Sequence, residues 1–191
     1  AEGVKVVVNG RNTERAERVA EAIRGSGGEA AVAVGDLSTD DGASDVVERA
    51  LNAFGGLEIV VNNAGGYEVS DWESATPERW AEVYNQNVVS MVRVIRGTLE
   101  SVKSGGWGRF IQISSGIGTA PFPGMADYAA TKAANTNMSL SLAKALAGTG
   151  VTSNTLSPGA IRTSSATDIF AQFVGAAPGD EAERAFVETM L

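Results

Sequence analysis

Short apolar segments alternate with longer segments of helical character along this 191-residue chain, and the alternation restricts its fold more than any other feature. The segments that read as strands are rich in branched apolar residues, and they cover residues 4–8, 30–34, 57–61, 109–113 and 151–156. The helical segments between them cover residues 13–24, 38–54, 76–103 (in one or two pieces) and 127–147. Strands that alternate with helices of this length predict an α/β fold, with a doubly wound, Rossmann-like parallel sheet in three αβα layers.

A cluster of polar or glycine residues follows each predicted strand. These clusters are residues 9–12, Asp36, residues 62–65, Ser114 with Ser115, and residues 157–163. Ligands of such sheets bind beyond the carboxyl ends of the strands, so five clusters at successive strand ends predict one shared binding region. The tail from residue 160 to residue 191 is expected to be a loop with one or two short helices.

The composition excludes several kinds of chemistry. The chain has no cysteine and no histidine, which rules out disulfides, thiol nucleophiles, Ser-His-Asp triads and metal sites built on these ligands, and no metal is expected. Acid–base work is therefore left to Tyr, Lys, Asp or Glu. The net charge of −8 argues against nucleic acid or an anionic membrane as a partner. No segment resembles a membrane span or a signal peptide, so a cytoplasmic location is the default expectation.

Tyr128 and Lys132 are four residues apart on a predicted helix, which places both on one face. A phenol has a pKa near about 10, and a neighbouring ammonium favours the phenolate and lowers that pKa. Ser115 lies thirteen residues before Tyr128, at a strand end, where its hydroxyl could bind the oxygen that Tyr128 protonates. Two ordinary interpretations stay open: a surface Tyr packed over a Lys stem, and a Ser that caps a helix.

The ordered set of motifs resembles the short-chain dehydrogenase/reductase family over nearly the whole chain, and is most similar to its 3-oxoacyl-acyl-carrier-protein reductases. The motifs that carry the resemblance are Asn62-Asn63-Ala64-Gly65, Asn87, Ser115, Tyr128-Ala129-Ala130-Thr131-Lys132 and Ser157-Pro158-Gly159-Ala160-Ile161-Arg162-Thr163. The resemblance implies that Tyr128 donates a proton to a carbonyl oxygen while Ser115 polarises that oxygen. It also implies that Lys132 lowers the pKa of Tyr128 and holds the nicotinamide ribose, and that Asn87 supports a proton-relaying water.

The same resemblance implies a nicotinamide cofactor. The residues expected to contact it are Arg11, Asp36, Leu37, Asn63, Ala64, Gly65, Tyr128, Lys132, Pro158, Gly159, Ile161 and Thr163. Members that prefer NAD usually place an acid at the position of Asn9, where it binds the ribose hydroxyls. Because no acid stands there, and because Arg11 could pair with a 2′-phosphate, NADP(H) is favoured over NAD(H). The alternative is that Arg11 is a solvated loop residue.

The family begins with a strand and a Gly-rich turn, and this chain shows neither. The missing strand is expected between segments 4–8 and 57–61, and its absence leaves two apolar strand edges unpaired. Residues 1–191 are therefore expected to be a single Rossmann-like domain, incomplete at both ends, of a longer natural protein.

The leading hypothesis is a carbonyl reductase or alcohol dehydrogenase that acts on a small molecule, with 3-oxoacyl thioesters as the first substrate to consider. One alternative is a non-catalytic nucleotide-binding or regulatory relative, and another is an isomerase or lyase on the same scaffold. By resemblance alone, the protein is expected to be a homo-oligomer, a tetramer formed through the helices at 82–103 and 127–147.

Overall fold

A computed structural model of the chain describes residues 2–159, 161, 171 and 174–189. The strands in these ranges are β1 (Lys5–Gly10), β2 (Glu29–Val34), β3 (Ile59–Asn62), β4 (Gly108–Ile113) and β5 (Val151–Leu156). The helices are α1 (Thr13–Gly25), α2 (Asp40–Phe54), α3 (Pro77–Tyr84), α4 (Ser90–Ser104), α5 (Ala126–Ala145) and α7 (Asp180–Thr189), with short turns η1 (Asn85–Val89) and η2 (Gly116–Gly118). The predicted Rossmann-like α/β fold is confirmed.

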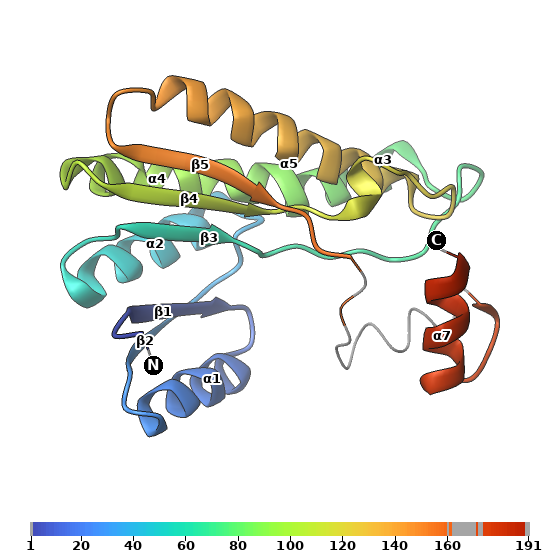
Figure 1. The fold of residues 1–191 in the computed structure, drawn as a ribbon, viewed down its shortest axis with the longest axis horizontal. Helices are drawn as coiled ribbons and strands as arrows, with labels where there is room; N and C mark the ends of the chain where they lie inside the picture. Colours follow the sequence, from blue (N-terminus) through green and yellow to red (C-terminus); the bar gives the residue numbers. More distant parts are fainter. Residues whose placement is uncertain (1, 160, 162–170, 172–173, 190–191) are drawn as a thin grey trace.

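The strands form two parallel sheets. β1 pairs with β2, where Lys5 lies opposite Glu29, and β4 pairs with β3 on one side and β5 on the other. β1 and β3 face each other without pairing, and Figure 1 shows the two sheets next to each other with β2 and β5 at the outer sides. The two unpaired edges lie where the sequence predicted them.

Local sequence signals determine where the helices begin and end. The side chains of Asn12, Thr39 and Thr76 each accept a hydrogen bond from a backbone N–H of the following turn, as N-cap residues do. Pro77 occupies the first turn of α3, where backbone N–H groups have no hydrogen-bond partner within the helix, so proline costs no helical hydrogen bond there. Gly55 ends α2 with a φ of +82°, a left-handed conformation that favours glycine.

The sequence predicted one helix or two over residues 76–103, and the structure has two, α3 and α4. A π-helical turn, η1, separates α3 from α4 and buries Asn87 and Val88. Such single π turns are often found at functional sites, because the wider turn redirects the side chains that it carries.

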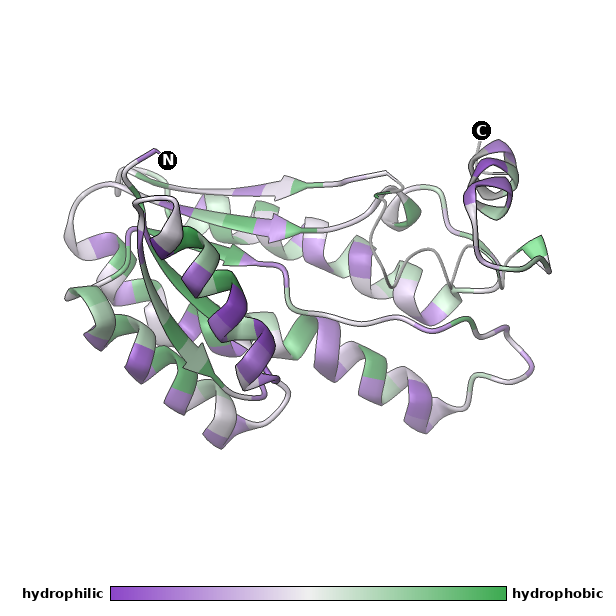
Figure 2. Cartoon of the chain, turned by 90° about the horizontal axis from the view of Figure 1, so that it is seen from below, coloured by the Kyte–Doolittle hydropathy of each residue, from purple (hydrophilic) through white to green (hydrophobic). Residues whose placement is uncertain are grey.

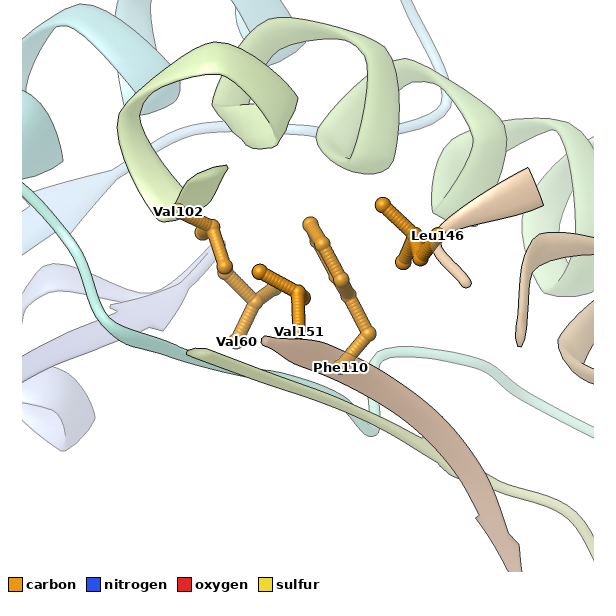
Figure 3. Packing of buried hydrophobic residues seen from close by; sticks show 5 residues of the cluster. All are labelled: Val60, Val102, Phe110, Leu146 and Val151. Atoms are coloured by element: carbon orange, nitrogen blue, oxygen red, sulfur yellow. The ribbon is translucent and has the colours of Figure 1, made fainter. Parts of the chain in front are cut away.

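The main core lies between β3–β4–β5 and the helices α4 and α5 (Figure 3). Its buried members are Val60, Val102, Phe110, Leu146 and Val151. Side chains alternate between the two faces of a strand, so Val60 is buried whereas its neighbours Ile59 and Val61 are exposed. In Figure 2, the helices alternate hydrophobic and hydrophilic residues along their length. No helix within the described ranges is long and apolar enough to cross a membrane.

Replacing Phe110 by Ala should lower the free energy of unfolding by about 3–5 kcal/mol, because this ring is fully buried at the centre of the core. Leu140→Ala on α5 is the matched control: Leu140 is 56% exposed, and we expect a change within about 0.5 kcal/mol. Urea denaturation followed by circular dichroism measures both. Equal losses for the two variants would show that this cluster is not the centre of stability.

Candidate active site

The carboxyl ends of all five described strands lie at the same side of the molecule, where the arrowheads point in Figure 1. The first turns of α5 and the turn η2 lie at this side as well. The predicted site residues are carried by the loops and helix ends that meet there.

Tyr128 and Lys132 lie one turn apart at the start of α5, as predicted. The Lys132 ammonium is 5.3 Å from the centre of the Tyr128 ring, and it donates a hydrogen bond of 2.8 Å to the carbonyl of Ile113 at the end of β4. The Lys132 side chain is almost completely buried, with 5% of the residue exposed. The burial of Lys132 argues against the alternative of a surface Tyr packed over a Lys stem.

Two contacts bring the Ser115 turn onto α5. The Ser114 hydroxyl donates to the Lys132 carbonyl at 2.8 Å, and Gly118 packs so closely that a Cβ there would lie 2.9 Å from the Ala133 nitrogen. The Ser115 hydroxyl accepts a 3.4 Å hydrogen bond from the N–H of Ile117, so it also caps η2. The structure therefore brings Ser115 to the turn of α5 that carries Lys132 and confirms the capping interpretation, while its catalytic role stays a prediction.

Burial shifts the two titrating groups in opposite directions, because it disfavours whichever form carries a charge. Burial raises the pKa of Tyr128 to about 12, and the neighbouring Tyr67 adds to this rise. Burial lowers the pKa of Lys132 to about 8. The expected lowering of the Tyr128 pKa by Lys132 is thus not found, because burial of the phenol and the neighbouring Tyr67 both raise that pKa.

Asn87 is fully buried in the π turn, and its amide holds the loop that follows β3. Its Nδ2 donates to the carbonyls of Gly66 and Val83, both at 2.9 Å, and its Oδ1 accepts from the N–H of Gly66 at 3.1 Å. A Cβ on Gly65 would collide with this oxygen, so the close approach requires glycine. The proposed relay water toward Lys132 stays a prediction from the resemblance.

Tyr67 is a site residue that sequence reasoning missed. Its ring centre lies 5.0 Å from that of Tyr128, with an angle of 36° between the planes. Both rings pack on the buried side chains of Ile117, Met125 and Ala129. The available signal was weak: an aromatic residue directly after Gly65-Gly66, in a loop already assigned to ligand binding.

A cavity of about 760 Å³ lies between β1 and β3. The predicted cofactor residues that line it are Arg11, Asp36, Leu37, Asn63, Ala64 and Gly65. Ser115, Tyr128 and Lys132 are not among its lining residues, so the cavity and the tyrosine are two neighbouring parts of the site rather than one pocket. The loop from Asn63 to Tyr67 connects them.

Two guanidinium-bearing side chains, Arg11 and Arg15, line the cavity at the end of β1. Arg15 was missed, although it stands four residues after Arg11 at the start of α1. Asp36 accepts hydrogen bonds from the N–H and the hydroxyl of Ser38, and these bonds, together with nearby Arg11, lower the pKa of its carboxyl group. Asp36 therefore also organises the turn after β2.

The segment after β5 reaches the Ser115 turn, since the Gly116 N–H donates to the Pro158 carbonyl at 3.2 Å. Pro158 and Gly159 do not line the cavity, and Ile161 is largely exposed. Thr163 lies outside the described residues. Among the described side chains, no group of three or more His, Cys, Asp or Glu could hold a metal ion.

The polar end of the cavity, at the carboxyl ends of β1 and β3, carries residues that suit a nicotinamide dinucleotide, whereas the rest of its lining is apolar and comes from the facing strands and the helices beside them. Arg11 and Arg15 supply cationic donors suited to a phosphate. Asn9 stands where an acid would repel a 2′-phosphate, and its amide donates to the Ala33 carbonyl at 2.8 Å. The close approach of Gly65 to Asn87 gives a backbone surface without side chains at the cavity wall.

Comparison with known proteins agrees with this geometry. The family described as short chain dehydrogenase matches residues 1–173. An uncharacterized oxidoreductase of Bacillus subtilis is 38% identical over 158 residues, which are 83% of this chain and 59% of that protein. The chain thus spans less than two thirds of the length of this relative.

Two solved structures have the same fold. The 3-oxoacyl-(acyl-carrier-protein) reductase of Agrobacterium tumefaciens, with NADP bound, gives a TM-score of 0.82 at 33% identity and covers 91% of this chain and 67% of its own. The L-sorbose reductase of Gluconobacter frateurii, in complex with NADPH and L-sorbose, gives 0.87 at 28% identity and covers 94% and 68%.

The buried Lys132 should make stability depend on pH in a defined window. Its pKa is about 8 when folded and has the ordinary value of 10.5 when unfolded, so between these values the unfolded chain binds the extra proton. Wild-type stability should therefore rise relative to Lys132→Met by roughly 1 kcal/mol per pH unit above pH 8.

Urea denaturation at several pH values measures this slope, with exposed Lys144→Met as the matched control. The slope is read between pH 8 and about pH 9, because nearer pH 10 the unfolded Tyr128 loses its proton while the folded Tyr128 keeps it, which adds a slope of the opposite sign. If the free energy of unfolding of wild type and of Lys132→Met changed in parallel with pH, the lowered pKa of the buried Lys132 would be contradicted.

Proposed function

Because the chain belongs to the short-chain dehydrogenase family, we propose that it is an NADP-dependent oxidoreductase that interconverts a carbonyl compound and its alcohol. The observation that carries the proposal is the pairing of a half-buried, protonated Tyr128 with a buried Lys132, which is fixed to the end of β4 through the Ile113 carbonyl. A phenol held in this way is a proton donor in a place where ligands of parallel sheets bind.

The chain's own residues divide the work of carbonyl reduction. The bound nicotinamide supplies the hydride that goes to the carbonyl carbon. Tyr128 gives its hydroxyl proton to the carbonyl oxygen, and the positive charge of the neighbouring Lys132 ammonium stabilises the resulting phenolate until it takes up a proton from solvent. Ser115 donates a hydrogen bond to the same oxygen and fixes its position. In the oxidation direction each proton moves the opposite way.

Cofactor preference follows from the charges at the end of β1. Arg11 and Arg15 both line the cavity there, and the Asn9 amide is bound to the Ala33 carbonyl. A phosphate gains charge-assisted hydrogen bonds from guanidinium groups, whereas a ribose hydroxyl gains much less. These residues support NADP(H) over NAD(H), and the NADP-bound and NADPH-bound solved relatives agree with that preference.

A small carbonyl or alcohol is the substrate class that this site supports, and a 3-oxoacyl thioester is the first candidate. The candidate rests on the likeness to the Agrobacterium tumefaciens 3-oxoacyl-(acyl-carrier-protein) reductase. The likeness to a sorbose reductase of similar fold keeps sugar substrates in the assay panel.

Removing Arg11 or Arg15 should weaken NADPH binding about ten- to one-hundredfold, the factor expected for a lost charge-assisted hydrogen bond. Binding of NADH should change much less. Titration followed by nicotinamide fluorescence measures Arg11→Ala and Arg15→Ala beside Arg18→Ala, an exposed arginine of α1 that does not line the cavity. Equal loss of NADPH and NADH affinity would refute a 2′-phosphate contact.

Tyr128→Phe should reduce carbonyl reduction by roughly 10²- to 10⁴-fold while it leaves NADPH binding nearly unchanged, because only the transferred proton is removed. The rate is followed by the absorbance of the reduced nicotinamide, with 3-oxoacyl thioesters, ketones and ketoses as substrates. Turnover that survives in Tyr128→Phe would remove this phenol from the mechanism. NADPH binding without turnover of any substrate by the wild type would identify a non-catalytic relative.

A further inference from the structure

Residues 66–70 form a short strap that crosses the start of α5, and it is anchored at both ends. At one end, the amide of Asn87 binds both the N–H and the carbonyl of Gly66. At the other end, the Ser70 N–H donates to the Gly124 carbonyl at 2.9 Å, and its hydroxyl bonds to Asp127 at 3.2 Å. The strap is therefore held against the turn that carries Tyr128.

An ion-pair network adds a third anchor. Arg79 of α3 bonds through Nε to the Asp127 carboxylate at 3.3 Å and through Nη1 to Glu68 of the strap at 2.5 Å. Asp127 is 1% exposed, so its charge depends on these partners and on the Tyr128 N–H, which donates to it at 2.7 Å. A carboxylate buried to this degree keeps its partners in place, because losing them leaves an uncompensated charge.

Between these anchors, the Tyr67 ring packs on the Tyr128 ring. The ring centres are 5.0 Å apart, within the range of favourable aromatic pairs. Burial raises the pKa of the Tyr67 phenol, which agrees with a position that is shielded from water. Together with Ile117, Met125 and Ala129, the two rings form one apolar cluster.

The charged groups next to this cluster are already engaged. The Asp127 carboxylate is bound by Arg79 and Ser70, and the Lys132 ammonium donates to the Ile113 carbonyl. The described residues that pack around Tyr128 thus present rings and aliphatic carbons, with the phenol hydroxyls as their polar groups.

From this arrangement, we propose that Tyr67 forms one wall of the site in which the carbonyl substrate meets Tyr128, and that this wall favours neutral substrates with a planar aromatic group beside the carbonyl. The inference rests on the proposed reductase function. A planar group gains ring–ring contact with Tyr67, whereas a carboxylate would lose its hydration and would meet no unengaged cation among the described residues of this cluster.

Three ketones test the effects of planarity and charge separately. They are acetophenone, its saturated analogue cyclohexyl methyl ketone, and 4-acetylbenzoate, which adds a carboxylate. For the wild type, kcat/KM with NADPH should be highest for acetophenone. Tyr67→Ala should raise KM for acetophenone about three- to tenfold, the factor that corresponds to one aromatic pair. The value of kcat should change less, and Tyr67→Phe should retain the wild-type preference.

Tyr84→Ala is the matched control, since Tyr84 is an exposed tyrosine at the end of α3 outside the cluster. Its KM values should equal those of the wild type. A wild type that reduces the three ketones equally well, or a Tyr67→Ala variant with unchanged KM for acetophenone, would overturn the inference while the reductase function stands.

A second measurement does not depend on turnover. The chain contains three tyrosines, so ¹³Cζ-tyrosine NMR gives three signals that Tyr→Phe variants assign. Acetophenone added to the NADPH-bound protein should shift the Tyr67 and Tyr128 signals and leave Tyr84 in place. Such shifts without turnover would contradict only the proposed function. If neither the Tyr67 nor the Tyr128 signal shifts, the inference that Tyr67 lines the substrate site is wrong.

Discussion

The buried amide of Asn87 is the contact on which the whole site depends. It binds the N–H and the carbonyl of Gly66, and the π turn is what brings this side chain inward from a helix that would otherwise run on. Gly65, on one side of the contact, lines the cavity, and Tyr67, on the other side, packs on Tyr128. One side chain thus links the cavity beside Gly65 to the ring pair of Tyr67 and Tyr128.

The position of α5 depends on directional polar contacts as much as on apolar packing. Its buried face carries Ser139, whose hydroxyl forms a hydrogen bond of 2.9 Å with the hydroxyl of Ser153 on β5. Apolar surfaces tolerate sliding, whereas a hydrogen bond in a buried place fixes register, because a shifted partner stays unpaired. The bond from Ser114 to the Lys132 carbonyl acts in the same way at the helix turn that carries the chemistry.

The alternation of apolar and helical segments was enough to predict the order of strands and helices, and cap residues such as Asn12 and Thr76 predicted where helices begin. Motif positions at strand ends predicted which residues gather at one edge. Sequence spacing could not show Tyr67, since a contact between a loop and a helix 61 positions further on follows no local period. It also gave the wrong direction for the Tyr128 pKa, because desolvation depends on packing from several segments.

The burial of the Tyr128 and Lys132 side chains has two chemical consequences. It keeps Tyr128 in its protonated form far above neutral pH, so the proton donor is ready for a carbonyl oxygen. It also brings the pKa of Lys132 to about 8, where the ammonium is close to losing its charge. A phenolate formed by proton transfer would stand beside this ammonium and be stabilised by it, which a resting phenol is not. The raised pKa of Tyr128 thus favours the neutral phenol before proton transfer. The charge of Lys132 stabilises Tyr128 only after proton transfer, when the phenol has become a phenolate.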